Sequence, residues 1–138
     1  MPNIALISRV GAHKPYLERG VKQKEVRQLQ TPFGKSNPIH VFQHGKVEFA
    51  VMSRHGEDHY QVAAPFVEEK ANIWALKTMG VEKIISFDAV GSLREGIAPG
   101  ELVILDDVID LRGESYSLFE GKGLGFIRLN PLLFADAR

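Results

Sequence analysis

The sequence of 138 residues has no cysteine, no excess of charge of either sign and no long apolar run. The absence of cysteine excludes disulfide scaffolds, zinc sites built on thiolates and cysteine nucleophiles. Seventeen basic and seventeen acidic side chains give a formal net charge of zero, whereas nucleic-acid-binding domains are typically basic. No apolar run approaches the roughly 20 residues of a membrane span. We therefore expect neither a nucleic-acid partner nor a membrane partner.

The N-terminal segment also lacks the pattern of a secretory signal. Residues 1–9 contain no basic region followed by a long apolar region, so we expect a cytoplasmic protein. What the sequence does contain is the composition of a globular domain, with 44% hydrophobic and 25% charged residues. A chain of this length can bury one core, which predicts a single α/β domain over residues 1–138.

The first half of the chain predicts several strands. Residues 3–7 form a short apolar run that is typical of a buried strand. Residues 13–38 are polar and are interrupted by proline and glycine, which favours loops and an edge strand. Residues 39–42 and 47–52 are apolar segments on either side of Gln43-His44-Gly45-Lys46, and this pattern predicts a hairpin.

A helix is predicted after the hairpin. Pro65 suits the first turn of a helix. Val67, Ala71 and Trp74 recur at the i, i+4 and i+7 positions of one helical face, and Gly80 ends the pattern.

Two further apolar segments, residues 83–87 and 101–105, predict strands after this helix. A strand, a helix and a strand at this spacing indicate a βαβ unit. The predicted fold is therefore α/β, with a mixed, partly parallel sheet flanked by helices. Residues 126–134 add six large apolar side chains, which pack either on the chain's own core or against another polypeptide.

Arg54-His55-Gly56 follows a predicted strand, at the position where ligands collect in open α/β sheets. An arginine fork beside an imidazole can bind a phosphate through two hydrogen bonds, and glycine lets the backbone approach the anion. An arginine and a histidine at a strand end can equally serve a structural role. Both interpretations are open from these residues alone.

Other patterns carry weaker signals. His55 and His59 are four residues apart, but Gly56 lies between them just after a strand, so we predict no metal site there. Ser92 lacks the pattern of a nucleophile elbow. The glycine-rich residues 121–125 match no cofactor-binding pattern. Asp106, Asp107 and Asp110 suit either a cation or a turn that favours acidic residues.

Four segments, taken together and in order, are similar to one known family. They are Thr31-Pro32-Phe33-Gly34-Lys35, Arg54-His55-Gly56, Ala71-Asn72-Ile73-Trp74-Ala75-Leu76-Lys77 and Ala89-Val90-Gly91-Ser92-Leu93-Arg94-Glu95. Over about residues 3–120, the chain resembles the methylthioadenosine phosphorylase branch of the purine nucleoside phosphorylases. The resemblance implies a nucleoside-phosphorylase-type fold, of which this chain would be the N-terminal half.

The resemblance also implies a reaction and a site. The family cleaves the glycosidic bond of a purine nucleoside, with inorganic phosphate as co-substrate and no other cofactor. By resemblance, Arg54 and His55 would bind the phosphate, and the backbone at Ala89 and Gly11 would line the same pocket. Members of the family form oligomers, so we expect a homo- or hetero-oligomer.

The chain departs from the family at two points of this pocket. Ser8-Arg9-Val10-Gly11 stands where the family has Gly-Gly-Ser/Thr-Gly, so Gly11 keeps a place in the pocket, whereas Arg9 and Val10 are weaker candidates. Asp88 stands where the family often has a small hydroxyl residue. A carboxylate there repels phosphate unless it is paired or turned away.

The resemblance stops near the middle of the family's length. The acid that protonates the purine belongs to the other half, so no catalytic residue can be assigned here. Two hypotheses follow. The chain is a subunit or fragment of a purine nucleoside phosphorylase that works with a complementary chain, or it is a non-catalytic relative that binds a partner or a nucleoside. The sequence does not specify the nucleoside.

Overall fold

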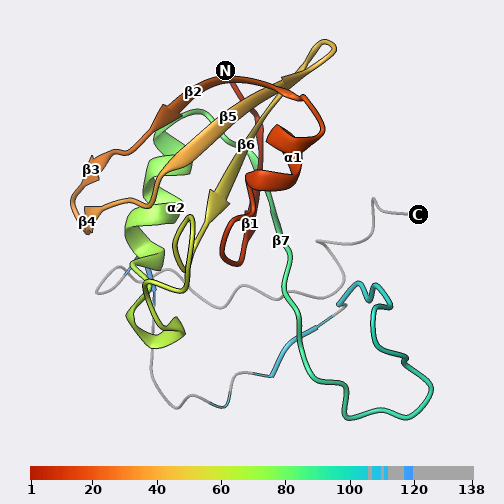
Figure 1. Cartoon of the computed structure of the whole chain (residues 1–138). Helices are drawn as coiled ribbons and strands as arrows, with labels where there is room; N and C mark the ends of the chain where they lie inside the picture. Colours follow the sequence, from red (N-terminus) through yellow and green to blue (C-terminus); the bar gives the residue numbers. More distant parts are fainter. Residues whose placement is uncertain (106, 110, 112–116, 120–138) are drawn as a thin grey trace. The chain divides into compact units, whose positions relative to one another are not determined.

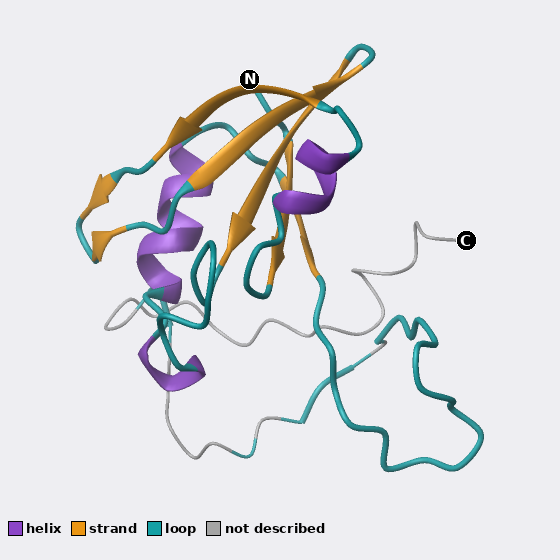
Figure 2. Ribbon diagram, viewed as in Figure 1, coloured by secondary structure: helices purple, strands orange, loops and turns teal. Residues whose placement is uncertain are grey.

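A computed structural model describes residues 1–105, 107–109, 111 and 117–119 of the chain. The chain divides into two units, Met1–Val90 and Gly91–Arg138. Every helix and strand of the described residues lies in the first unit (Figures 1 and 2). None of these helices has the length and hydropathy required to cross a bilayer. The single domain expected over residues 1–138 stays a prediction.

The first unit is built on a five-stranded sheet. In the order in which they lie side by side, its strands are β2 (Lys22–Arg27), β5 (Ile39–His44), β6 (Val47–Ser53), β1 (Ile4–Ser8) and β7 (Lys83–Ser86). β1 pairs in parallel with β6 and β7, whereas β5 is antiparallel to both of its neighbours. A separate two-stranded ribbon joins β3 (Gln30–Thr31) to β4 (Gly34–Lys35). The predicted mixed, partly parallel sheet and the β5–β6 hairpin are confirmed.

Helix α2 (Glu69–Thr78) covers one face of this sheet. Its buried side chains Ala75 and Leu76 belong to the same core as Val41 of β5 and Met52 of β6. The small alanines at positions 71 and 75 let the helix approach the strands closely. Trp74, which the helical pattern placed on the buried face, is 45% exposed and meets Phe33 edge to face, because the buried stripe runs through residues 71, 72, 75, 76 and 79.

The short helix α1 (Lys14–Glu18) lies against the opposite face. The ring of Tyr16 is 5.3 Å from that of Phe42 and 5.2 Å from that of Phe49, measured between ring centroids. Side chains alternate across a strand, so Phe42 points away from the neighbouring core residue Val41. The sheet therefore carries one helix on each face, as expected.

Two predicted elements differ in the structure. Pro65 lies in a separate 3₁₀ helix, Ala64–Phe66, and α2 begins only at Glu69 because Val67 is extended and buries its side chain. Residues 101–105 form no strand and are exposed. A strand needs a neighbour with which to share hydrogen bonds, and these residues have none among those described. The apolar residues 126–134 and the glycine-rich residues 121–125 lie outside the described residues.

Candidate functional site

The carboxyl ends of the three parallel strands meet at one edge of the sheet. Just beyond β6, the amide of Arg54 donates a hydrogen bond to the carbonyl of Ser8 at 2.9 Å. Just beyond β7, the amide of Phe87 donates to the carbonyl of Ile7, also at 2.9 Å, and the Ser8 hydroxyl donates to the Phe87 carbonyl at 2.8 Å. Such an edge is where open α/β sheets bind their ligands.

At this edge, the guanidinium of Arg54 is paired with the carboxylate of Asp88. Nη1 lies 2.8 Å from Oδ2 and Nη2 lies 2.6 Å from Oδ1, so the two groups form a bidentate pair. Asp88 is thus paired with a cation rather than turned away. The carboxylate of Asp88 accepts hydrogen bonds from the same N–H groups of the Arg54 guanidinium that would bind a phosphate in a bidentate manner.

The side chain of His55 holds the same guanidinium from another side. His55 is 4% exposed, and its Nδ1–H donates to the carbonyl of Val62 at 2.9 Å. In that tautomer Nε2 has a free lone pair, and it accepts a hydrogen bond from Nε of Arg54 at 3.0 Å. The ring also stacks on Tyr60. His55 therefore fixes the direction of Arg54.

The backbone around Arg54 is fixed by Asn37, a residue that the sequence patterns did not single out. Its side-chain amide donates to the carbonyls of Ser53 and Arg54 at 2.8 and 2.9 Å. The backbone N–H of Asn37 donates to Oδ1 of Asn72 at 2.7 Å, and Asn72 is buried on α2. A polar residue on the apolar face of the predicted helix was the one signal in the sequence for this network.

Gly56 is required by the turn that follows. Its φ of +125° lies in a region that side-chain-bearing residues rarely adopt, and a Cβ there would lie 2.5 Å from the carbonyl oxygen of His59. The carbonyl of His55 accepts hydrogen bonds from the amides of Gln61 and Val62 at 2.8 and 3.1 Å. This tight loop brings the chain back to the buried His55 ring.

The other predicted phosphate contacts are arranged differently. The amide of Gly11 donates to the carbonyl of Gly56 at 3.3 Å, so it is engaged within the chain. Arg9 is exposed and, among the described residues, makes no hydrogen bond or ion pair. Val10 is half-buried, and Ala89 is exposed directly after Asp88. The phosphate contacts assigned to these residues and to Arg54 and His55 stay predictions.

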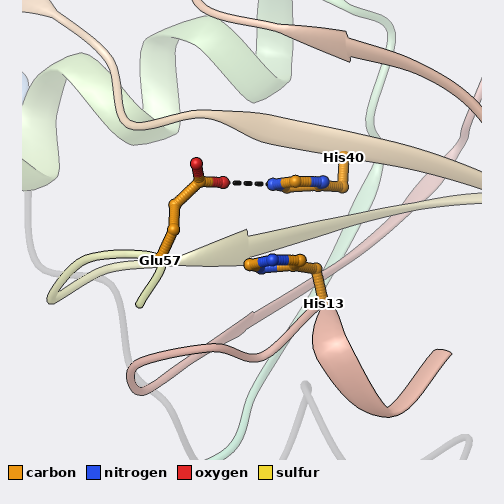
Figure 3. Close-up of side chains that lie close together, drawn as sticks. All are labelled: His13, His40 and Glu57. Atoms are coloured by element: carbon orange, nitrogen blue, oxygen red, sulfur yellow. Dashed lines mark hydrogen bonds and ion pairs between the residues drawn. The ribbon is translucent and has the colours of Figure 1, made fainter. Parts of the chain in front are cut away.

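A second group of polar side chains lies on the sheet face that carries α1 (Figure 3). The rings of His13 and His40 are both buried and stack in parallel, with 4.0 Å between centroids and 3° between planes. Nε2 of His40 is paired with the carboxylate of Glu57. Burial, and next the neighbouring His40, lowers the pKa of His13.

Sequence reasoning missed this group because its members are far apart in the sequence: His40 comes 27 positions after His13, and Glu57 comes 17 positions after His40. His55 and His59, where the sequence predicts no metal site, differ in their surroundings. Both ring nitrogens of His55 have partners, and His59 is exposed. Of the aspartates considered as cation ligands, Asp107 is exposed and the other two, Asp106 and Asp110, lie outside the described residues.

Comparison with known proteins shows what this arrangement is similar to. Residues 3–137 match the family model of the Phosphorylase superfamily. An S-methyl-5'-thioadenosine phosphorylase of Thermococcus kodakarensis is 36% identical over 131 residues, a region that covers 94% of this chain and 49% of the relative. A "Probable 6-oxopurine nucleoside phosphorylase" of the same organism is 36% identical over 123 residues, covering 88% of this chain and 44% of the relative.

Solved structures agree with these matches. The methylthioadenosine phosphorylase of Schistosoma mansoni in its apo form superposes with a TM-score of 0.68 and 34% sequence identity, covering 78% of this chain and 37% of that one. A methylthioadenosine phosphorylase from an antarctic soil metagenomic library gives a TM-score of 0.55 and 31% identity, covering 62% and 29%. The chain spans about half the length of the curated relatives that it matches.

Proposed function

The chain belongs to the phosphorylase superfamily, and from this premise we propose that it supplies the phosphate-binding side of a purine nucleoside phosphorylase site. The proposed reaction is the phosphate-dependent cleavage of the glycosidic bond of a purine nucleoside, with methylthioadenosine the first substrate to test. Activity requires a complementary chain or segment, equivalent to the half of the relatives that this chain does not match.

The observation that carries the proposal is the position of Arg54. Its guanidinium stands at the carboxyl edge of the parallel strands, and its direction is set by the buried His55 ring. Arg54 uses three of its five N–H groups within the chain, one toward His55 and two toward Asp88. The remaining N–H groups, together with those released when Asp88 moves, can bind a phosphate.

The reaction defines what the complementary part must supply. A phosphate oxygen forms a bond to the anomeric carbon, the bond from that carbon to the base nitrogen breaks, and the base takes up a proton as it leaves. The products are a sugar 1-phosphate and a free purine. Arg54 would position the phosphate and balance its charge, whereas the proton donor for the base would come from the complementary part.

The test is the release of free purine from methylthioadenosine and from inosine in the presence of phosphate. The chain is assayed alone and after mixing with the separately produced C-terminal half of a homologous phosphorylase. We expect purine release only in the mixture, and only with phosphate present. The Arg54→Ala variant should abolish that release, whereas the exposed arginine control Arg19→Ala should leave it unchanged. Equal activity in the Arg54→Ala mixture would contradict the proposed role.

A second candidate function is favoured by the Arg54–Asp88 pair itself. In a non-catalytic relative that binds a partner or a nucleoside, an internal carboxylate can replace the phosphate permanently. Calorimetric titration with phosphate separates the two functions. If the chain is half of a phosphorylase, the wild-type chain binds phosphate. If it is a non-catalytic relative, only the Asp88→Thr variant, which lacks the competing charge, binds phosphate. Phosphate affinity that is measurable in the wild type and lost in Arg54→Ala would rule out the second candidate.

A further inference from the structure

The group formed by His13, His40 and Glu57 has no part in the function proposed above. Its three potential ligand atoms all lie within 4.8 Å of one another. They come from three different segments: His13 directly precedes α1, His40 lies on β5, and Glu57 follows β6. We propose that these three side chains form a binding site for a divalent metal ion of the zinc class.

The hydrogen bonds of His40 provide the first argument. Nδ1 of His40 lies 3.1 Å from Oε1 of Gln23, a carbonyl oxygen that can only accept, so Nδ1 carries the proton. In the neutral ring, Nε2 then presents a lone pair to the carboxylate of Glu57. Two acceptors that face each other require a cation between them, either a proton or a metal ion. Metal-bound histidines commonly donate their other N–H to such a carbonyl.

His13 provides the third ligand. Its ring is 7% exposed and stacks on His40, so one of its nitrogens lies close to the two other potential ligand atoms. An uncharged imidazole is the form that binds a metal ion. A metal ion binds in the plane of an imidazole ring, and the two rings are parallel. Uptake of the ion therefore requires one ring to rotate out of the stack. This rotation would change the spectroscopic signals of both histidines.

The surrounding backbone holds the segments that carry two of the ligands together. The amide of Gly11 donates to the carbonyl of Gly56, and the amide of Ala12 donates to Oγ of Ser53 at 2.9 Å. On the next residues of the two segments, Lys14 and Asp58 form an ion pair at 3.0 Å. These contacts hold in place the backbone of the two segments that carry His13 and Glu57.

The composition of the group indicates which ions it would bind. Two imidazoles and one carboxylate match the ligands of zinc sites that keep one position open for water, and thiolates are absent from this chain. The side chain of Glu57 is 33% exposed. It also lines a surface pocket of about 240 Å³, together with Gln28, Asn37, Pro38, Gly56, Asp58, Gln61 and Val62. An ion can therefore reach the carboxylate from solvent.

The experiment uses the full chain after chelator treatment. Zn²⁺ is titrated by calorimetry in competition with a chelator, and Co²⁺ is added separately because its visible absorption reports low-coordinate nitrogen and oxygen ligands. We expect one ion per chain. The Glu57→Gln and His13→Asn variants should weaken Zn²⁺ binding at least about 100-fold, and Gln23→Leu, which removes the partner of His40, should weaken it about 10–100-fold.

The matched control is the double variant His44→Ala with His59→Ala, because both of these histidines are exposed and lie outside the group. It should bind one Zn²⁺ with unchanged affinity. Circular dichroism of each variant establishes that the fold is kept, and the conservative Glu57→Gln change at a half-exposed position serves if a histidine variant unfolds. The proposal is overturned if the wild type binds no stoichiometric ion, or if Glu57→Gln binds Zn²⁺ as tightly as the wild type. In either case a proton alone joins His40 to Glu57.

Discussion

Strands β6 and β7 both pair in parallel with β1, one on each side, and both end beside the Arg54–Asp88 pair, but their surroundings are opposite. The last four residues of β6 are buried, and Met52 is fully inaccessible. All four residues of β7 are exposed, and its two isoleucines are 42% and 53% exposed. Sequence reasoning could not distinguish the two strands, because both are short apolar runs.

The difference comes from what lies beyond each strand. β6 has β5 on its other side, α2 on one face and α1 on the other. β7 has no second neighbour among the described residues, so its outer edge offers unpaired backbone groups beside exposed apolar side chains. On the β6 side of β1, the core of the first unit is covered by β5, α1 and α2. On the β7 side, the strand edge and the apolar side chains are exposed.

The largest expected effect comes from truncating one apolar side chain on each strand. Met52→Ala removes a fully buried side chain of β6 and should lower the free energy of unfolding by about 2–5 kcal/mol. Ile85→Ala acts on a half-exposed side chain of β7 and should lower it by less than about 1 kcal/mol. Urea unfolding followed by circular dichroism measures both.

This pair of variants can also contradict the difference in burial between β6 and β7. If Ile85→Ala destabilises the chain as much as Met52→Ala does, β7 is covered in solution by another polypeptide or by a further part of this chain. Sedimentation of the wild type then distinguishes the two, because only a second polypeptide raises the mass of the particle.

A smaller effect is expected at one glycine in the segment that follows each of the two strands. Gly56→Ala, after β6, places a Cβ at a φ of +125° and 2.5 Å from a carbonyl oxygen, and should cost about 1–3 kcal/mol. Gly91→Ala, after β7, meets no atom within 4 Å and has no positive φ, so the free energy of unfolding should hardly change. Thermal unfolding of the two variants gives the comparison. A neutral Gly56→Ala would mean that the turn after β6 is looser than the structure shows.

Much of the fold was predictable from local patterns. The strands near residues 3–7 and 83–87, the hairpin of residues 39–52 and the partly parallel sheet are confirmed, since each has its own apolar period and turn residues. The prediction of a strand at residues 101–105 was wrong. Its apolar run resembles that of β6, but a strand exists only where a neighbour accepts its hydrogen bonds, and no local pattern reports that neighbour.

The candidate site was predictable only in part, for a similar reason. Arg54 and His55 are adjacent in the sequence and follow a strand, so their place at the sheet edge could be inferred. The bidentate contact of Arg54 with Asp88 spans 34 residues, and the stack of His13 on His40 depends on two segments that meet only in the folded sheet. Such pairs could not be predicted from the sequence because their members are far apart along the chain and come together only through the order of the strands in the sheet.

The smallest expected effect concerns the pair that joins the two strand ends. Because Arg54 and Asp88 are about a quarter exposed, a double-mutant cycle with Arg54→Ala and Asp88→Ala should give a coupling free energy of about 0.5–1 kcal/mol. Between about 0.1 M and about 1 M salt the coupling should fall, since salt screens exposed charges. A coupling of several kcal/mol that is insensitive to salt would mean that the pair is buried in solution. The carboxyl end of β7 would then be as buried as that of β6, and the exposure of β7 would not extend to the Arg54–Asp88 pair.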